Sequence, residues 1–312
     1  MILRGRAVSS GRAEGRSLVT EKPMSFLGGV DQKTGIVTDP ASDLRGMRIA
    51  GRVLAFPHGK GSTVGSYVIY GLARRGRGPA AIVNERTEAI VATGAILGGT
   101  PLVDGVEVSL LRTGDRTIVD GDAGVVALPD VTERPVVTAF LGNRGRILVV
   151  KRGSRVKTFR GAWSGISGYL EGLEPPLWRA RREVLEETGI EVARLVARGP
   201  VFRTRHESTV FAIHPFLFDV QGRRVTLDWE NVEARWIRHE EIQRLRKTVP
   251  RLADVLASVL PGPRSGGPRP GRPPARGGAA GARRGPRGSR RTGESRRASR
   301  PGRGGPGRAS AP

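Results

Sequence analysis

The chain of 312 residues contains no cysteine. It therefore has no disulfide bond, no thiolate nucleophile, and no cysteine ligand for zinc or for an iron–sulfur cluster. The sequence also lacks any apolar run of about 18 residues, so it predicts no membrane-spanning helix. The segment Met1–Arg6 lacks the apolar core of a signal peptide, and we therefore expect a cytoplasmic protein.

Acidic residues are scarce: 29 Asp and Glu face 53 Lys and Arg, which gives a net charge of +24. About half of this excess lies after Leu260, in residues 261–312, which are almost wholly Gly, Pro, Arg, Ser and Ala. We predict that this tail is disordered, because it has no hydrophobic material for a core. A basic arm can bind nucleic acid weakly through phosphates. A solubilising tail explains it equally well, since no aromatic residue is interleaved for base stacking.

The length suits two domains with an appendage. We expect a β-rich domain over residues 1–130, a polar connector over 131–135 and a second domain over 136–260. In the first domain, strands alternate with helices predicted over 67–74 and 89–97, and one long apolar strand is predicted over 47–56. This order indicates an α/β fold with β-hairpins at its ends.

The second domain carries a spaced set of glycines and acids. The pattern G-x5-E-x7-R-E-U-x-E-E-x-G-U, with U aliphatic, begins at Gly168 and is met without gaps. Glu183, Glu186 and Glu187 stand at i, i+3 and i+4, so they project from one face of a predicted helix. A divalent cation would relieve their mutual repulsion, and carboxylate oxygens suit Mg²⁺ or Mn²⁺. The alternative is a solvated acidic face beside neighbouring arginines.

This spacing resembles the signature of the Nudix hydrolases, which are α/β/α sandwiches that cleave a nucleoside diphosphate linked to another group. The resemblance implies that the three glutamates are catalytic and bind Mg²⁺ or Mn²⁺, with the Gly168 carbonyl as an additional candidate ligand. It also implies that Arg182 holds the carboxylates in place and that Glu174 supports the loop or the helix. The reaction is attack of water on a phosphorus, assisted by the metal. The motif identifies the reaction but not the substrate.

Further residues of this domain are weaker candidates. Glu230 or Glu233 is a candidate for an additional carboxylate at the metal, although charge on a strand surface explains them as well. Arg203, Arg205 and His206 are candidates for phosphate contacts on the basis of their charge alone.

In the first domain, the stretch from Gly59 through Lys60 and Gly61 to Ser62 follows an apolar strand and precedes a helix. A glycine loop in this position presents backbone N–H groups to an anion, which makes Gly59, Lys60, Gly61 and Thr63 candidates for binding a phosphorylated substrate. It is not a Walker loop, because Gly61 rather than Ser or Thr follows Lys60. On physical grounds alone, a turn with a capping serine explains these residues as well.

Residues 1–130 resemble the small subunit of the type II aconitase X enzymes, the archaeal phosphomevalonate dehydratases. The matching stretches follow one another in order and cover nearly the whole domain: Leu3–Arg6, Ser25–Asp31, Thr38–Pro40, Gly59–Tyr67, Ala80–Asn84 and Thr113–Asp115. The resemblance implies a swivelling β/β/α domain that closes on a separate large subunit to form a heterodimer. The pair would dehydrate (R)-5-phosphomevalonate to trans-anhydromevalonate 5-phosphate, in the archaeal mevalonate route to isoprenoids.

By this resemblance, Ser62 is the proton acceptor. A free hydroxyl is a very weak base, so Ser62 has to be held near its alkoxide form, which N–H groups at a helix start and Lys60 would favour. The departing hydroxyl needs a Lewis acid, which a 4Fe–4S cluster can supply. Because the chain has no cysteine, that cluster is expected on the large subunit. His58 is a further candidate, although a structural histidine is the commoner case.

Three interpretations of the whole chain follow. The first is a fusion of a hydro-lyase small subunit with a metal-dependent diphosphate hydrolase. In the second, only the hydrolase is active and the first domain is a docking module. In the third, the protein binds RNA through its basic tail.

Overall fold

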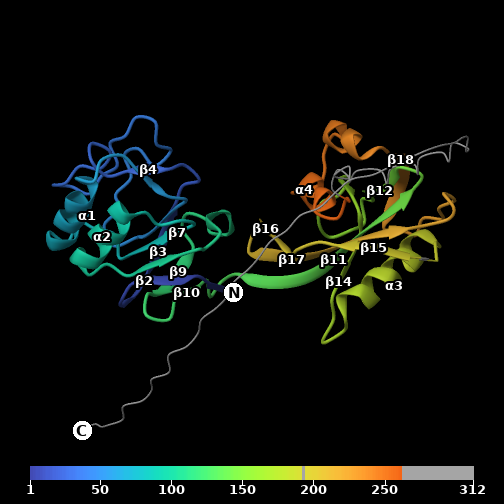
Figure 1. Cartoon of the computed structure of the whole chain (residues 1–312), viewed down its shortest axis with the longest axis horizontal. Coiled ribbons are helices and arrows are strands. Elements are labelled where there is room, and N and C mark those ends of the chain that lie inside the picture. Colours follow the sequence, from blue (N-terminus) through green and yellow to red (C-terminus); the bar gives the residue numbers. More distant parts are fainter. Residues whose placement is uncertain (192–193, 262–312) are drawn as a thin grey trace, which may run out of the picture. The chain divides into compact units, whose positions relative to one another are not determined.

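The computed structural model describes residues 1–191 and 194–261. The chain contains two domains in this range, each built around its own β-sheet with helices packed against it (Figure 1). The tail that we predict to be disordered lies outside the described residues from residue 262 onward. No helix in the described ranges is long and apolar enough to cross a membrane.

The first domain is organised by an eight-stranded mixed sheet in the order β1-β10-β9-β3-β5-β7-β8-β2. The neighbours from β3 to β8 are parallel and the other pairs are antiparallel. The strands are β1 (Ile2–Arg4), β2 (Arg6–Ser9), β3 (Arg12–Val19), β5 (Val53–Phe56), β7 (Ala81–Asn84), β8 (Leu102–Asp104), β9 (Arg116–Asp120) and β10 (Val125–Ala127). A separate parallel ribbon pairs β4 (Met24–Ser25) with β6 (Gly59–Lys60).

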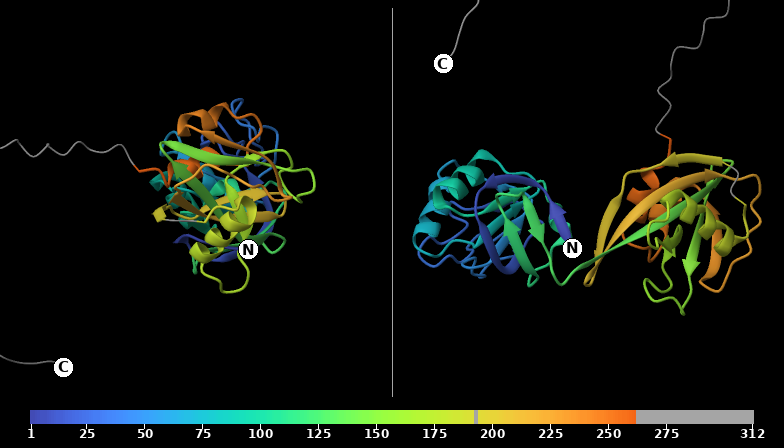
Figure 2. Two further views of the ribbon diagram at one scale, coloured as in Figure 1. Left: turned by 90° about the vertical axis from the view of Figure 1, so that its right-hand side faces the viewer. Right: turned by 90° about the horizontal axis from the view of Figure 1, so that it is seen from below.

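Helices α1 (Gly65–Arg74) and α2 (Ala89–Gly98) lie side by side against one face of this sheet (Figures 1 and 2). Along β5, Leu54 belongs to the core on the helix side, and Val53 belongs to the core on the opposite side. A strand that is covered on both faces is apolar at every position, and this is why apolar and polar residues do not alternate along β5. A short 3₁₀ helix, η1 (Val108–Leu110), follows β8. The predicted helices and the β/β/α architecture are confirmed.

The long apolar strand predicted over residues 47–56 is shorter in the structure. Strand β5 begins only at Val53. Before it, Gly51 adopts a φ of +71°, and Met47 is exposed. The chain turns at this glycine, because a positive φ is open to glycine and interrupts an extended strand. Apolar composition alone therefore overestimated the strand length.

The second domain has a sheet in the order β13-β12-β11-β17-β15, with β14 on β11, β16 on β17 and β18 on β12. Its strands are β11 (Thr132–Asn143), β12 (Arg146–Arg152), β13 (Trp163–Ser164), β14 (Ile166–Tyr169), β15 (Arg194–Arg198), β16 (Phe202–His206), β17 (Thr209–Asp219) and β18 (Asn231–Ile237). The long strands β11 and β17 run parallel to each other.

Helices cover both faces of this sheet. Helix α3 (Pro176–Thr188) packs on one face, and α4 (Leu252–Ala257) with the 3₁₀ helix η2 (His239–Arg244) packs on the other. Along β11, Val137 and Ala139 belong to the core with α3, whereas Phe140 belongs to the core with α4. The alternation of side chains along a strand produces this division. The predicted α/β/α sandwich is confirmed.

Residues 132–135, which we expected to form a polar connector, are the beginning of β11 in the structure. They pair with residues 209–212 of β17. Backbone pairing with a neighbouring strand outweighs the polar composition of this segment, because β propensity depends strongly on context.

Candidate functional site

Helix α3 brings the three glutamates of the motif to one cavity. Pro176 occupies the first helical position, where its missing N–H is not needed, and Gly189 ends the helix in the left-handed conformation. Glu183, Glu186 and Glu187 all line the same cavity, which we call the carboxylate cavity. Glu183 and Glu187 are buried, at 6% and 4% exposure, whereas Glu186 is exposed.

Glu187 is held by two hydrogen bonds. Its Oε2 accepts from the Asn231 side-chain amide at 2.6 Å, and its Oε1 accepts from the Ser167 backbone N–H at 3.2 Å. Burial raises the pKa of Glu187 to about 8, against the lowering effect of the Asn231 hydrogen bond. Burial likewise raises the pKa of Glu183, and the charge of Arg179 opposes that shift. The cavity therefore holds carboxyl groups that are costly to ionise without a cation nearby.

Two arginines of α3 each pair with a different carboxylate. Arg179 forms an ion pair with the buried Glu183, whereas Arg182 donates from Nε to Oε1 of the exposed Glu186 at 2.8 Å. Arg182 thus holds only one of the carboxylates for which we proposed it, and sequence reasoning missed Arg179. The i, i+4 spacing of Arg179 and Glu183 was the signal that could have revealed the pair.

The loop before α3 is supported by Glu174. Its Oε1 accepts a hydrogen bond of 2.9 Å from the backbone N–H of Glu171 and lies 4.0 Å from Nε of Arg179. These contacts are of the kind expected for a residue that supports the loop.

Gly168 lies in β14 directly against Glu183. A Cβ at this position would overlap the carboxyl group of Glu183. Only glycine therefore allows the strand and the buried glutamate to approach this closely.

The donor set of the cavity fits a divalent cation. Its carboxylate oxygens are the hard ligands that Mg²⁺ and Mn²⁺ prefer, and the buried, destabilised charges of Glu183 and Glu187 would be relieved by a cation. Within residues 1–191 and 194–261, no three His, Asp or Glu side chains converge closely enough to hold an ion. In this arrangement, Glu183 and Glu186 each form an ion pair with an arginine.

A loop before β18 adds acidic groups to the cavity. Asp228 and Glu230 line it, together with the exposed ring of Trp229. Glu233, our other candidate, does not line it and instead pairs with Arg235 and Lys151. Asp228 was missed, although it stands two residues before Glu230 in the same acidic run.

None of Arg203, Arg205 and His206, our candidates for phosphate contacts, lines the carboxylate cavity. Arg203 instead pairs with Glu133, and the ring of His206 lies against Phe159. Charge alone did not indicate where these side chains point. The cavity contains Arg152 instead, at the end of β12, which sequence reasoning missed.

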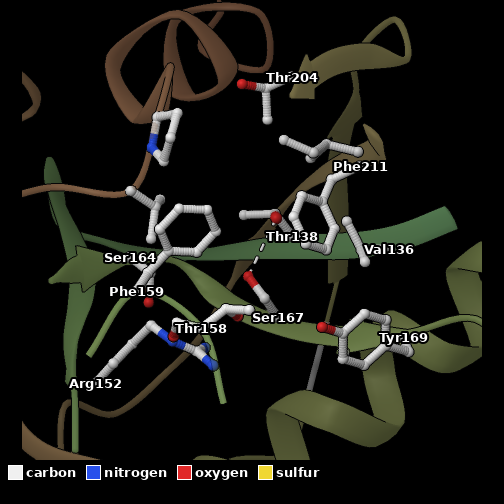
Figure 3. A pocket seen from close by; sticks show the side chains of 14 residues that line it. Val136, Thr138, Arg152, Thr158, Phe159, Ser164, Ser167, Tyr169, Thr204 and Phe211 are labelled. Atoms are coloured by element: carbon white, nitrogen blue, oxygen red, sulfur yellow. Dashed lines mark hydrogen bonds between the residues drawn. The ribbon is translucent and has the colours of Figure 1, made fainter. Parts of the chain in front are cut away.

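A second cavity adjoins the first, with which it shares lining residues. Figure 3 shows the side chains that line this second cavity. We call it the apolar pocket, because its walls are mostly hydrocarbon. The residues that line both cavities are Arg152, Ser167, Gly168 and Tyr169.

In the first domain, Ser62 stands on an exposed loop between β6 and α1. Its Oγ accepts a hydrogen bond of 3.3 Å from the backbone N–H of Val64. The preceding residue, Gly61, has a φ of +108°, a conformation that side chains with a Cβ rarely adopt. The hydroxyl is therefore open to a ligand or partner and receives an N–H donor near the start of the helix.

The other candidates around Ser62 have mixed positions. Nζ of Lys60 lies 3.7 Å from Oδ2 of Asp39, so its charge is shared with an acid. Gly59 is buried, whereas Thr63 is exposed, and its carbonyl accepts from the Ser66 hydroxyl. His58 is half-buried, and its carbonyl accepts from the Met24 N–H.

Comparison with known proteins separates the two domains. Residues 2–128 match the family model of the aconitase X swivel domain. The phosphomevalonate dehydratase small subunit of Pyrococcus furiosus is 58% identical over 128 residues, which are 41% of this chain and 96% of that protein. That of Methanocaldococcus jannaschii is 55% identical over 130 residues, 41% of this chain and 98% of that protein. A crystal structure of Thermococcus kodakaraensis aconitase X is 56% identical, covers 41% of this chain and 98% of its own, and has a TM-score of 0.41.

Residues 132–259 match the family model of the Nudix domain. The crystal structure of a MutT protein from Methanosarcina mazei is 22% identical, covers 42% of this chain and 94% of its own, and has a TM-score of 0.36.

Proposed function

The chain belongs, through its first domain, to the family of phosphomevalonate dehydratase small subunits and also carries a Nudix domain, and we propose that it works in both capacities. The first domain would complete a dehydratase that converts (R)-5-phosphomevalonate to trans-anhydromevalonate 5-phosphate. The second would hydrolyse a diphosphate with the help of Mg²⁺ or Mn²⁺. The observation that carries the first assignment is identity of 58% over 96% of a curated relative.

For the dehydratase, Ser62 is the proposed proton acceptor. Its exposure leaves Oγ accessible to the carbon next to the substrate carboxylate once a partner closes over the loop. The Val64 N–H that donates to Oγ would stabilise the alkoxide, because a hydrogen bond to the charged form favours that form.

An iron–sulfur cluster does not fit this chain. The sequence has no cysteine to ligate one, and the group that accepts the departing hydroxyl has to come from a large subunit. We therefore propose a heterodimer in which this chain contributes the base and the partner contributes the cluster.

Co-expression with a cysteine-rich large subunit tests this assignment. The complex should dehydrate phosphomevalonate, and Ser62→Ala should lower kcat by at least about a hundredfold, since general-base groups contribute about 10²–10⁴-fold. Ser10→Ala, at another exposed serine, serves as the control. A Ser62→Ala complex as active as the wild type would refute the role of the serine.

For the hydrolase, a bound divalent cation would lower the pKa of water and neutralise the leaving oxygen. The carboxylates of Glu183, Glu186 and Glu187 would hold it, with the Gly168 carbonyl as a further candidate. Asn231 and the Ser167 N–H fix the orientation of Glu187, and Arg152 is placed to bind a phosphate oxygen.

The hydrolase assignment is tested with the full chain and Mg²⁺. Glu186→Gln and Glu187→Gln should each abolish release of phosphate from a diphosphate, because loss of a metal ligand removes several kcal/mol of transition-state stabilisation. Glu171→Gln, at an exposed glutamate outside the cavity, should leave the rate unchanged. Activity retained in both cavity variants would overturn the assignment.

A further inference from the structure

The apolar pocket adjoins the carboxylate cavity and offers a space for the group attached to the diphosphate. It shares Arg152, Gly168 and Tyr169 with the carboxylate cavity, so the two spaces meet at one boundary. A diphosphate bound at the glutamates would direct its ester group across this boundary. The chemistry of the pocket walls therefore reports on the substrate class.

The pocket walls lack the side chains that most often recognise the edge of a nucleobase by hydrogen bonds. They are formed mainly by Val136, Phe159, Phe211, Ile213, Val249 and Pro250. No Asp, Glu, Asn or Gln side chain is among the described residues that line the pocket. A base edge carries several donors and acceptors, and each one that is buried without a partner weakens binding.

Some polar groups of the pocket are engaged with one another. The hydroxyls of Thr138 and Ser167 lie 3.1 Å apart and share a hydrogen bond (Figure 3). Nε of Arg152 donates to the Thr158 carbonyl at 3.2 Å. The buried Ser164 hydroxyl lacks a partner within the described part of the chain, and Thr158, Tyr169 and Thr204 also carry hydroxyls at the pocket wall. Hydroxyls alone do not reproduce the paired donors and acceptors that a carboxylate or amide side chain offers to a base edge.

The aromatic rings do not form a slot for a flat base either. The rings of Phe159 and Phe211 have centroids 6.0 Å apart and planes inclined by 60°, so one ring edge already contacts the other face. Tyr169 and Phe211 are inclined by 44° at 6.4 Å. Base recognition by stacking uses a ring face that is free and parallel to the base.

We propose that the substrate of the second domain is the diphosphate ester of a short, branched hydrocarbon alcohol, of the five-carbon prenyl class, rather than a nucleotide. This proposal rests on the hydrolase function proposed above. The relatives of the first domain are named phosphomevalonate dehydratase small subunits, after a phosphorylated branched acid. Fusion to such a domain supports a branched substrate for the second domain.

The reaction balances with water as the only co-substrate. The water oxygen forms a bond to one phosphorus, and the bridging P–O bond breaks, leaving its electron pair on the other phosphate. The products are the prenyl monophosphate and inorganic phosphate, with release of one proton.

The test compares three probes on the full chain with Mg²⁺: dimethylallyl diphosphate, ADP, and methyl diphosphate, which lacks the hydrocarbon chain. We expect kcat/KM for dimethylallyl diphosphate to exceed that for each of the others by at least about tenfold, since a methylene in an apolar pocket contributes about 10–200-fold. Equal values for dimethylallyl and methyl diphosphate, or a preference for ADP, would overturn the proposal.

Matched variants locate the effect in the pocket. Phe159 and Phe202 both pack, partly buried, on the same core, but only Phe159 lines the pocket. Phe159→Ala and the milder Phe159→Leu should lower kcat/KM for dimethylallyl diphosphate and leave methyl diphosphate unaffected, whereas Phe202→Ala should change neither. No selective loss in either Phe159 variant would contradict the proposal.

The two possible failures are distinguishable. If ADP is preferred and its hydrolysis is lost in Glu186→Gln, the hydrolase function stands and the substrate class is wrong. If no diphosphate is hydrolysed, or if both Glu186→Gln and Glu187→Gln still hydrolyse one, the proposed hydrolase function is refuted. The proposed substrate class is then refuted as well.

Discussion

The side-chain amide of Asn231 donates a hydrogen bond of 2.6 Å to Oε2 of Glu187 and so ties strand β18 to helix α3. Both residues are buried, at 5% and 4% exposure. The Asn231 hydrogen bond does not offset the desolvation of the carboxylate, and the pKa of Glu187 is raised to about 8. This residue therefore links the stability of the second domain to pH and to cation binding.

In the absence of divalent cations, the stability of the second domain should fall as the pH rises from about 4.5 to about 8. The unfolded glutamate has its ordinary pKa of 4.5, so in this range the folded state binds more protons than the unfolded state. The stabilisation is complete below pH 4.5 and is lost as the pH rises through about 8, with a slope of at most about 1.4 kcal/mol per pH unit.

Urea unfolding in EDTA, followed by tryptophan fluorescence, measures this slope for the second domain alone, because all four tryptophans lie in it. Glu187→Gln should flatten the dependence of the unfolding free energy on pH, and Mg²⁺ should reduce this dependence in the wild type. Identical slopes in the wild type and in Glu187→Gln would show that another group is responsible.

The two arginine–glutamate pairs of α3 should differ sharply in their contribution to stability. Arg179→Ala leaves Glu183 buried without its counter-charge and should cost about 3 kcal/mol at pH 7. Arg182→Ala removes a partner from the exposed Glu186 and should leave stability nearly unchanged. The same fluorescence-detected unfolding compares them, and equal losses would contradict the assignment of the buried pair to Arg179.

Helical periodicity explains why the three glutamates of the carboxylate cavity could be predicted from the sequence. Three glutamates at i, i+3 and i+4 must share a helix face, and the structure gathers them in one cavity. Asn231 and Asp228 could not be predicted in this way. Asn231 reaches Glu187, and Asp228 reaches the cavity, through the pairing of β18 with β12, a register that depends on long-range contacts.

The first domain shows a similar division. Its family and its β/β/α fold were predicted from the resemblance of its sequence stretches, and its two helices from their apolar positions. All three predictions are confirmed. The ion pair between Lys60 and Asp39 was not foreseen, because the loop that carries Asp39 has no periodic pattern that would place it. The length of β5 was wrong because composition does not reveal the turn at Gly51.

Gly168→Ala should abolish most hydrolase activity, because its methyl group would overlap the Glu183 carboxyl and displace it from the cavity. Gly222→Ala is a matched control in the same domain, since a Cβ at Gly222 meets no atom within 4 Å. Mg²⁺-dependent phosphate release from dimethylallyl diphosphate and from ADP is measured for both variants. If Gly168→Ala is as active as Gly222→Ala, close approach at this position is not required for hydrolysis.

Gly61→Ala should impair the dehydratase while leaving the hydrolase intact. The φ of +108° at Gly61 costs a residue with a Cβ about 1–3 kcal/mol, and the loop that carries Ser62 would shift to relieve that strain. Gly71→Ala is the control, because Gly71 lies inside α1, where alanine is favoured. Its new methyl group would meet only the flexible ends of the Arg75 and Gln32 side chains. Phosphomevalonate dehydration by the complex and Mg²⁺-dependent phosphate release are measured on the same preparations. A fall in dehydration alone, with phosphate release unchanged, would place the effect at the serine loop. Full dehydratase activity in Gly61→Ala would mean that the backbone conformation before Ser62 does not matter for proton transfer.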